Sequence, residues 1–314
     1  MKGWNKRRVE KTSQEWRVFI EGFRRALLSE TPSPYSRDLG AFLSHSRLLN
    51  KQFSKDTRRT LELLRTDRIK YCQFLNIPVT EVVPPTATTY MPKIPKSTYQ
   101  AEGVMGATSL ELGNLFGYEE TSSFVMYDIY PVRNFEDSKS FVNSRKMLSF
   151  HSDGSAHPKL SPDYVMLYCL RSSHQAHNLI VDLDELLGRL PSPIIDLLKQ
   201  PVFRHLVSQK PDRYDIKPVL FEEHGEITVR YDEDNVAGVG AEAIAAQQIL
   251  NREIRNIATT VTNSDHSLLI INNKRSLHAR SSFTPVFDGA DRWVKGAFVT
   301  KSDVRDGLML GLPT

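Results

Sequence analysis

The N-terminal third of the chain has the hydrophobic periodicity of helices, followed by a proline-rich stretch. From Gln14 to Leu28 apolar residues recur every three or four positions, which is the spacing of an amphipathic helix. A similar pattern from Asp56 to Phe74 predicts a second helix. Between Ile77 and Thr98 five prolines exclude a regular helix, so this segment is predicted to be an extended arm. We therefore expect residues 1–100 to form a helical cap and an arm packed on a core.

Beyond Leu110 the pattern changes to short apolar or alternating runs, which predict β-strands. Two helical stretches, Asp184 to Leu198 and Ala241 to Ala258, separate these runs. Because the pattern is neither strictly alternating nor that of a pure sandwich, a mixed α and β fold fits best, with a sheet or barrel core and flanking helices. We expect residues 101–314 to form this core within a single globular domain. The predicted strands are Phe124 to Ile129, Met147 to Phe150, Tyr164 to Leu170, Leu179 to Leu183, Ile227 to Tyr231, Leu268 to Ile271 and Trp293 to Val299.

Composition indicates a compact protein of a reducing compartment. With 314 residues, 40% of them hydrophobic, the chain can bury one substantial core or two modest ones. No run approaches the roughly 18 apolar residues of a membrane span, and the basic start Met1 to Glu10 lacks the apolar region of a secretory signal. The two cysteines, Cys72 and Cys169, lie far apart among apolar neighbours, as reduced buried thiols do. A soluble cytoplasmic protein without a membrane partner is expected.

The net charge of +4 is too mild to indicate a nucleic-acid partner. Basic residues cluster at Lys6 to Arg8, Arg24–Arg25 and Arg58–Arg59, but acids interrupt these clusters or the clusters fall within helical patterns. No zinc-finger spacing, aromatic stacking motif or polybasic tail accompanies them. Solvated helix faces are the simpler interpretation, and a small molecule is the expected partner.

Three residues have the types and spacing of a metal site. His151 and Asp153 follow the predicted strand ending at Phe150, and residues two apart in an extended chain point to the same face. Far downstream, His278 follows the predicted strand Leu268 to Ile271. Two histidines and one carboxylate form the facial triad of non-haem iron(II) oxygenases, which leaves positions open for a bidentate co-substrate and dioxygen. Without His278, the pair of His151 and Asp153 would be only weak evidence for a metal site.

A candidate for holding an anionic co-substrate is Arg292, fourteen residues after His278. The Asp288-Gly289 pair predicts a turn, after which the strand from Trp293 would bring the arginine back beside the metal. A planar guanidinium binds a carboxylate with two parallel hydrogen bonds that lysine does not reproduce. The alternative is a surface ion pair of Arg292 with Asp288 or Asp291.

Four segments together resemble the clavaminate synthase-like branch of the TauD-related iron(II)/2-oxoglutarate oxygenases, which includes hydroxylases of free arginine, asparagine and lysine. The resemblance covers about residues 100 to 300, and its last segment is the most specific. It implies a distorted double-stranded β-helix, a jelly-roll of the cupin-like kind, with iron at its open end. The segments are His151-Ser152-Asp153, Pro162 to Leu167, Asn273 to Arg280 and Phe283 to Trp293.

The same resemblance implies roles for individual residues. His151, Asp153 and His278 would bind Fe(II) in the catalytic core, and Arg292 would pair with the C5 carboxylate of 2-oxoglutarate, with O₂ as the second co-substrate. A threonine often assists this carboxylate in the family, and Asn178 falls near its place. Related halogenases have glycine or alanine where Asp153 stands, so hydroxylation, desaturation or ring closure is expected and halogenation is not.

The resemblance also implies a cationic substrate. In the amino-acid hydroxylases of this branch an acidic loop before the second histidine holds a cationic side chain, and Asp232 and Asp234 occupy that stretch. Two residues apart, they would share a face of an extended chain. A solvated acidic turn leading into the helix from Ala241 is the alternative. His157, close to Asp153, is expected to line the same cavity.

One departure from the branch concerns the carboxylate of the substrate. Those hydroxylases usually carry a second arginine four residues after the first, and here Gly296 stands at that position beside Lys295. Either Lys295 or another base binds the carboxylate, or the substrate is a decarboxylated, cyclised or carrier-bound derivative.

The predicted function is hydroxylation of an unactivated C–H bond of a basic amino acid, or of a small molecule derived from one, in a biosynthetic pathway. Desaturation and oxidative cyclisation stay open, because the same oxidising chemistry serves all three reactions. A catalytically silent binding module is the alternative from another class. The sequence does not distinguish a monomer from a homodimer.

Overall fold

The computed structural model describes most of the chain from residue 32 to residue 302, and the backbone of two further strands. The expected helix from Gln14 to Leu28 lies outside the described residues. The described ranges are 32–36, 39–79, 81–91, 94–118, 124–157, 161–207, 210–223 and 225–302, together with the strands at 8–9 and 308–310.

A large sheet forms one wall of the molecule, with the strand order β1-β2-β14-β6-β16-β3-β17 and with β4 also paired to β16. The central strands β14 (Ser267–Asn272), β6 (Tyr164–Arg171) and β16 (Trp293–Thr300) are antiparallel to one another and buried at nearly every residue. Burial on both faces explains why these strands are continuous apolar runs in the sequence. The remaining strands are β1 (Arg8–Val9), β2 (Tyr71–Phe74), β3 (Asn114–Tyr118), β4 (Met126–Ile129) and β17 (Leu308–Leu310).

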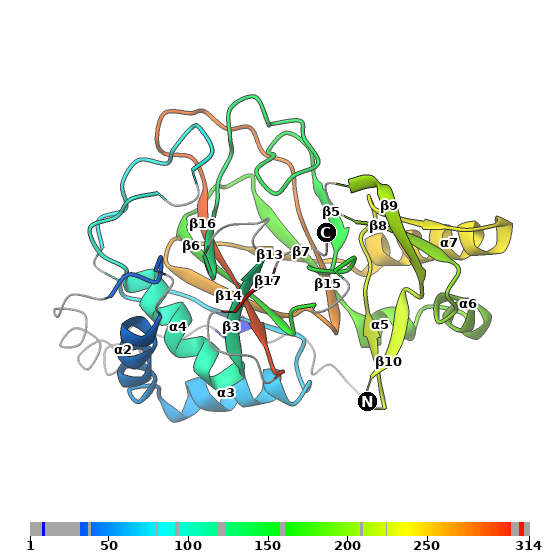
Figure 1. Ribbon diagram of the computed structural model, residues 1–314, viewed down its shortest axis with the longest axis horizontal. Coiled ribbons are helices and arrows are strands. Elements are labelled where there is room, and N and C mark those ends of the chain that lie inside the picture. The colour runs from blue at the N-terminus through cyan, green and yellow to red at the C-terminus, as the bar shows by residue number, and fades with distance from the viewer. Residues whose placement is uncertain are drawn as a thin grey trace.

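Three helices pack on the outer face of the large sheet (Figure 1). They are α2 (Gly40–Asn50), α3 (Lys55–Arg65) and α4 (Gln100–Leu112), and their buried side chains form one apolar cluster with alternate residues of β6, β14 and β16. The Ser54 side chain caps α3 by accepting a hydrogen bond from the Thr57 backbone N–H. These helices therefore cover the outer face of β6, β14 and β16.

The predicted helix from Asp56 to Phe74 is only partly right. It ends at Arg65, and Tyr71–Phe74 forms β2, which pairs with β14. Between the two, Asp67 has a φ of 55°, which ends the helical path of the chain. A short apolar run does not distinguish a helix end from a buried strand. The predicted arm from Ile77 to Thr98 is confirmed, since its described residues form neither helix nor strand.

A second sheet faces the first and has the order β13-β7-β15-β5, with antiparallel neighbours throughout. Apolar side chains between the sheets join β6, β14 and β16 to Ile180 and Val261 of the second sheet. All seven predicted strands are present with slightly different ends, so the mixed α and β class is confirmed. The bounds are β13 (Thr259–Thr262), β7 (His177–Asp182), β15 (Ser276–Arg280) and β5 (Leu148–His151).

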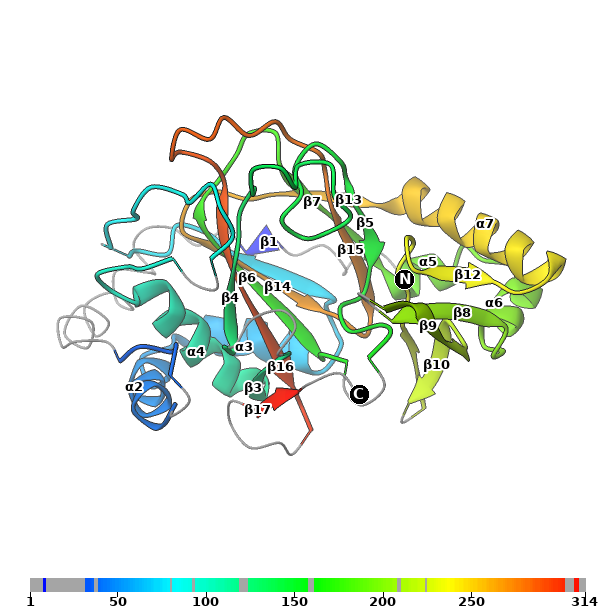
Figure 2. The ribbon, with the colours of Figure 1, turned by 45° about the horizontal axis from the view of Figure 1, so that its top comes forward.

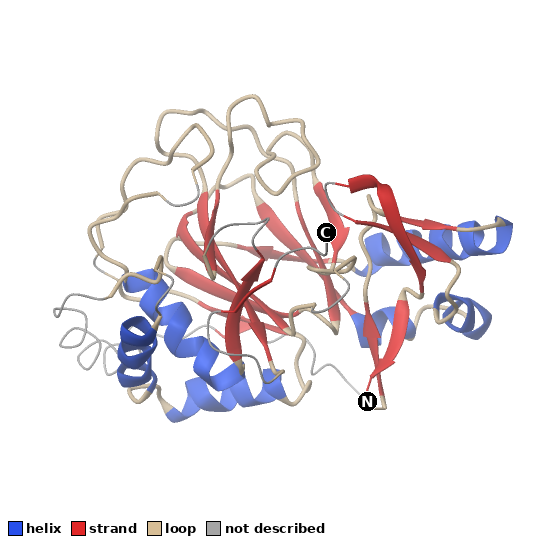
Figure 3. Ribbon diagram, viewed as in Figure 1, coloured by secondary structure: helices blue, strands red, loops and turns tan. Residues whose placement is uncertain are grey.

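Further helices and small sheets cover the far side of the second sheet, opposite the first group of helices (Figure 3). The predicted helix Asp184 to Leu198 is split, because Pro191 interrupts it. No described helix is both long and apolar enough to cross a lipid bilayer. The elements are α5 (Leu183–Leu187), α6 (Ser192–Leu198), α7 (Ala241–Ile257), β8 (Phe203–Val207), β9 (Lys210–Lys217), β10 (Leu220–Glu223), β11 (Glu226–Val229) and β12 (Val236–Gly238).

Three long loops, which precede α4, β5 and β16, gather at one end of the two sheets (Figure 2). Backbone hydrogen bonds tie them together: the Arg133 N–H donates to the Thr88 carbonyl at 2.8 Å, and the Thr86 N–H donates to the Gly289 carbonyl at 2.8 Å. The loop from Tyr130 to Met147 is thereby held beside the start of β5.

Candidate metal centre and its cavity

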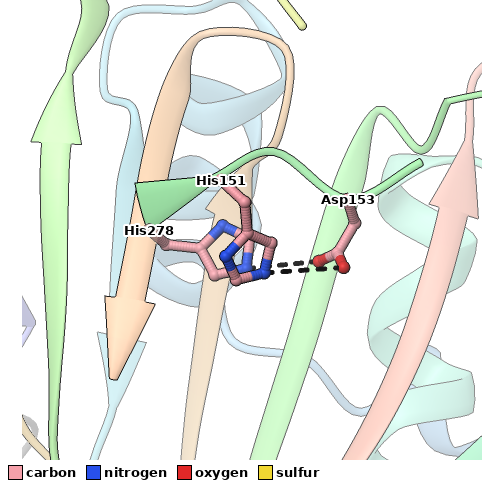
Figure 4. Close-up of side chains that lie close together, drawn as sticks. All are labelled: His151, Asp153 and His278. Atoms are coloured by element: carbon pink, nitrogen blue, oxygen red, sulfur yellow. Dashed lines mark ion pairs between the residues drawn. The ribbon is translucent and has the colours of Figure 1, made fainter. Parts of the chain in front are cut away.

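The second sheet brings together three side chains of the types that bind metals. His151 is the last residue of β5, and Asp153 follows two residues later. His278 lies in the middle of β15, directly opposite His151 in the antiparallel ladder. The three side chains converge on one point (Figure 4). Residues more than a hundred positions apart in the sequence thus meet as predicted.

The geometry of the cluster suits one metal ion. The His278 Nε2 atom lies 3.2 Å from the Asp153 Oδ2 atom, and the His151 Nε2 atom lies 3.8 Å from the Asp153 Oδ1 atom. One candidate ligand atom from each residue lies within 4.8 Å of the others. The His151 Nδ1 atom is 2.7 Å from the Ser149 carbonyl, so Nδ1–H donates there and Nε2 keeps its lone pair for the centre.

Asn273, in the turn between β14 and β15, holds the backbone of Asp153 in place. Its Oδ1 atom accepts a hydrogen bond from the Asp153 N–H at 2.7 Å, and its Nδ2 atom donates to the Asp153 carbonyl at 3.0 Å. Asn273 is fully buried. This contact fixes the carboxylate relative to His278, five residues further along the chain, and sequence reasoning did not assign it a role.

The electrostatics of the cluster favour the protonation states that metal binding requires. Burial alone would raise the pKa of the Asp153 carboxyl, but the hydrogen bond from His278 and the charges of both histidines lower it overall. Burial, and then the neighbouring His151, lower the pKa of His278. An ionised carboxylate and a neutral imidazole result, as a metal ligand set needs.

The cluster opens into a cavity of about 570 Å³ that is lined by aromatic and acidic side chains. Asp232 lies beside the cluster, because its backbone forms a bridge with that of His151. The predicted residues Asp232, Asp234 and His157 all line this cavity, and the buried His157 ring lies 4.7 Å from the Tyr118 ring. The aromatic residues of the lining are Tyr118, Phe135, Phe141 and Phe298.

Arg292 is buried, with 4% of its surface exposed, and its Nε atom has no hydrogen-bond partner among the described residues. Burial lowers the pKa of its guanidinium. The alternative of a surface ion pair is wrong, because Asp291 accepts hydrogen bonds from the backbone N–H groups of Val286 and Phe287, and Asp288 accepts one from Ala290. No carboxylate in the described part of the chain pairs with Arg292. Its charge is thus available for an anionic ligand.

Arg280 is a second buried guanidinium that sequence reasoning missed. It lies two residues after His278 in β15 and therefore points to the same face. One of its terminal nitrogens donates to the Asn143 side chain and, at 3.4 Å, to the Lys146 carbonyl, whereas the other has no partner among the described residues. Burial, followed by the charge of Arg292, lowers its pKa to about 9. Two like charges buried near each other favour binding of an anion between them.

Of the remaining predicted residues, Asn178 lies near these arginines and Lys295 does not. Asn178 is directly opposite Arg280 in the β7–β15 ladder, and its Nδ2 atom donates to Asn263 at 3.0 Å. Lys295 is fully buried on the other face of β16, 2.6 Å from Asp128 and 3.2 Å from Glu102. The prediction that Lys295 binds a substrate carboxylate is wrong, because successive residues of a strand point to opposite faces.

A triad of two histidines and one carboxylate beside a cavity, with buried arginines nearby that no described carboxylate neutralises, defines the class of 2-oxoglutarate-dependent dioxygenases. Residues 107–298 match the family model described as taurine catabolism dioxygenase TauD, TfdA family, and the chain belongs to this family. The match confirms both the family resemblance and the dioxygenase class expected from the sequence.

Curated relatives of the chain are amino-acid oxygenases and related enzymes. The L-lysine 3-hydroxylase of Catenulispora acidiphila is 26% identical over 73% of this chain and 66% of the relative, just under two thirds of its length. Clavaminate synthase 2 of Streptomyces clavuligerus is 26% identical over 91% of each chain. The L-asparagine oxygenase of Streptomyces coelicolor is 28% identical over 72% of this chain and 74% of the relative.

Solved structures share the fold over nearly the whole chain. Asparagine oxygenase in complex with Fe(II), 3-hydroxyasparagine and succinate has a TM-score of 0.87 and 23% identity, covering 98% of this chain and 100% of that one. The non-haem iron oxygenase OrfP in complex with Fe and α-ketoglutaric acid has a TM-score of 0.83 and 21% identity, covering 95% of each chain.

Proposed function

We propose that this chain is an Fe(II)/2-oxoglutarate-dependent oxygenase that hydroxylates an unactivated C–H bond of a basic amino acid or of a small molecule derived from one. The observation that carries this proposal is the cluster of His151, Asp153 and His278 at the end of a cavity that also contains Asp232 and Asp234. The relatives that hydroxylate lysine, ornithine, arginine and asparagine agree with it.

The residues present fit an iron(II) ion. His151, Asp153 and His278 would hold it through two neutral imidazole nitrogens and one carboxylate oxygen, the donor set of the facial triad. The Ser149 carbonyl orients one imidazole, and Asn273 orients the carboxylate. Such supporting contacts typically raise metal affinity by about 10- to 100-fold.

The buried arginines fit 2-oxoglutarate. Arg292 would pair with its C5 carboxylate, Arg280 would add a second positive charge, and the side chain of Asn178, opposite Arg280, would supply a polar contact. Iron, O₂ and 2-oxoglutarate together supply the oxidising chemistry: 2-oxoglutarate loses CO₂ and becomes succinate with one oxygen atom, while the other oxygen atom enters the C–H bond of the substrate.

Asp232 and Asp234 would hold the basic group of the substrate. Asp232 accepts hydrogen bonds from the Asp234 N–H at 2.9 Å and from the Asn235 side chain at 2.7 Å, which fix its carboxylate at the cavity wall. The ion pair of Asp234 with Lys139 is long, at 3.8 Å, and the lysine side chain is 74% exposed. An exposed pair of this kind contributes about 0–1 kcal/mol, so a substrate cation can replace the lysine.

The fold proposed for this site is the distorted double-stranded β-helix. Two facing, mostly antiparallel sheets with an apolar filling support it. Residues 101–314 would form this catalytic core and residues 1–100 the helical cap and arm, within one globular domain. In this division the cap contributes β2 to the large sheet, and α4 of the core packs with the helices of the cap.

The test is succinate formation from 2-oxoglutarate under air with added Fe(II), comparing wild type with His151→Ala. The matched control is His174→Ala, which removes an exposed histidine of the loop between β6 and β7. We expect turnover and iron binding to be lost in the first variant and kept in the second. Wild-type protein that neither binds Fe(II) nor forms succinate would refute the proposal, and the mass of the product distinguishes hydroxylation from desaturation or cyclisation.

A further inference from the structure

Position 296, next to the aromatic lining of the cavity, has no room for a side chain. Gly296 of β16 is directly opposite Tyr127 of β4 in the antiparallel ladder. A Cβ atom at Gly296 would lie 2.4 Å from two carbons of the Tyr127 ring and 2.8 Å from its hydroxyl oxygen. The space that a longer side chain would occupy is filled by the tyrosine, because protein interiors are close-packed.

Tyr127 belongs to an aromatic wall that extends to the metal cluster. Its ring lies 5.2 Å from that of Phe298 and 6.2 Å from that of Phe141, and both phenylalanines line the cavity. Burial, and then the charge of Asp153, raise the pKa of Tyr127 well above its usual value, so the hydroxyl stays protonated near the cluster. Among the described residues, this side of the cavity is therefore aromatic and carries no positive side chain.

The charges around the cavity are mostly negative. Asp153, Asp232 and Asp234 contribute carboxylates, whereas Lys139 is the one lysine or arginine among the described lining residues, and it is largely exposed and lies beside Asp234. Lys295 points away from the cavity, into its ion pairs with Asp128 and Glu102. A substrate carboxylate entering this part of the described structure would be buried without an opposite charge, which is strongly unfavourable.

We infer that the substrate is a cation without a free carboxylate: an amine or guanidine whose acid group is absent, or is masked as an amide or ester. Its positive side chain binds Asp232 and Asp234, and the end that lacks the carboxylate lies against Phe298, Phe141 and Tyr127, next to the metal cluster. This inference rests on the proposed function and names the substrate class for the same site.

The experiment compares matched pairs of probes that differ in the carboxylate: L-arginine against agmatine and L-arginine amide, and L-lysine against cadaverine and L-lysine amide. Succinate formation by the Fe(II)-loaded enzyme under air gives kcat/KM for each probe. We expect at least one probe without the free acid to exceed its parent amino acid by tenfold or more. Free acids that are equal or better, or no response to any of the probes, would overturn the inference.

Paired variants test whether the Tyr127 ring causes the preference for probes without a free carboxylate. Gly296→Arg combined with Tyr127→Ala replaces the ring by a guanidinium and should move the preference towards the free acids by at least tenfold. Tyr127→Phe keeps the ring and should keep the wild-type preference. Iron binding to each variant, measured first, shows that the site is intact. If the wild-type enzyme binds iron and forms succinate but prefers the free acids, this inference alone is refuted. If the wild-type enzyme neither binds iron nor forms succinate, the proposed function is refuted as well.

Discussion

Arg292 offers a sharp test of the proposed co-substrate site, because a buried charge that binds 2-oxoglutarate should destabilise the protein when 2-oxoglutarate is absent. The guanidinium is buried, its Nε atom has no partner, and the described residues supply no carboxylate to it. Arg292→Met replaces it with an apolar side chain of similar length. Replacing buried charges by packed apolar groups typically stabilises by about 1–4 kcal/mol, so the ligand-free variant should be more stable than wild type.

The same substitution should nearly abolish co-substrate binding. Removing one partner of a buried ion pair typically costs about 3–5 kcal/mol, which corresponds to a rise in Kd for 2-oxoglutarate of between about 100-fold and several thousand-fold. Calorimetric titration of the metal-loaded protein without oxygen measures this Kd, and thermal unfolding of the ligand-free protein measures stability. At about 2 °C per kcal/mol, the gain in Tm should be on the order of 2–8 °C.

Arg171 is the matched control. Its guanidinium donates to the Thr86 side chain and to the carbonyls of Gly289 and Pro84, so it is compensated within the protein. Arg171→Met should therefore lower Tm and leave the Kd for 2-oxoglutarate unchanged. The reasoning fails if Arg292→Met lowers Tm as Arg171→Met does, or if it changes the Kd by less than about threefold.

Three further predictions follow from single contacts. Asn273→Ala removes both hydrogen bonds to the Asp153 backbone and should weaken Fe(II) binding by about 10- to 100-fold in an anaerobic chelator competition; unchanged affinity would contradict its supporting role. Asp232→Asn should lower kcat/KM for the cationic probes by about tenfold, whereas Glu233→Gln, on the same segment but outside the cavity lining, should not. His205 is buried and its pKa is lowered to about 3, chiefly by burial. Below about pH 6.5 the unfolded chain therefore binds a proton at this histidine that the folded chain does not bind, so the free energy of unfolding decreases as the pH falls. Urea unfolding of the wild type should show a loss of about 2 kcal/mol between pH 8 and pH 5, and His205→Gln should remove this loss. Equal losses in the two proteins would refute this prediction.

Local alternation was enough to predict part of the site. His151 and Asp153 follow a predicted strand two residues apart, and their common face follows from strand geometry alone. The same rule applied to β15 places Arg280 on the face of His278, so this residue could have been found. That β15 lies opposite β5 could not be derived from spacing, because pairing between distant strands depends on the whole fold. His278 was linked to the other two residues by the ligand set of the facial triad and by the family resemblance, not by strand geometry.

Helix α4 shows where periodicity fails. It is buried around almost its whole circumference, including Glu102 and Gly106, so it has no apolar stripe to recognise. A Cβ atom at Gly106 would lie 2.4 Å from the Ser46 Oγ atom and 2.7 Å from the Phe42 ring, which shows how closely α2 approaches. Packing that depends on a missing side chain leaves little trace in a hydrophobic pattern.

Successive residues of β16 differ strongly in polarity, because their side chains point to opposite faces of the large sheet. On the outer face, Lys295 pairs with Asp128, and the Trp293 Nε1 atom donates to the same carboxylate at 2.6 Å. On the inner face, Gly296 and Phe298 form part of the aromatic wall. Buried ion pairs of this kind contribute little net stability, but an unpaired partner would be costly, so they favour one register of the strand. A register shift of one residue would place the lysine in the cavity, and the outer ion pairs therefore help to keep the inner wall free of positive charge.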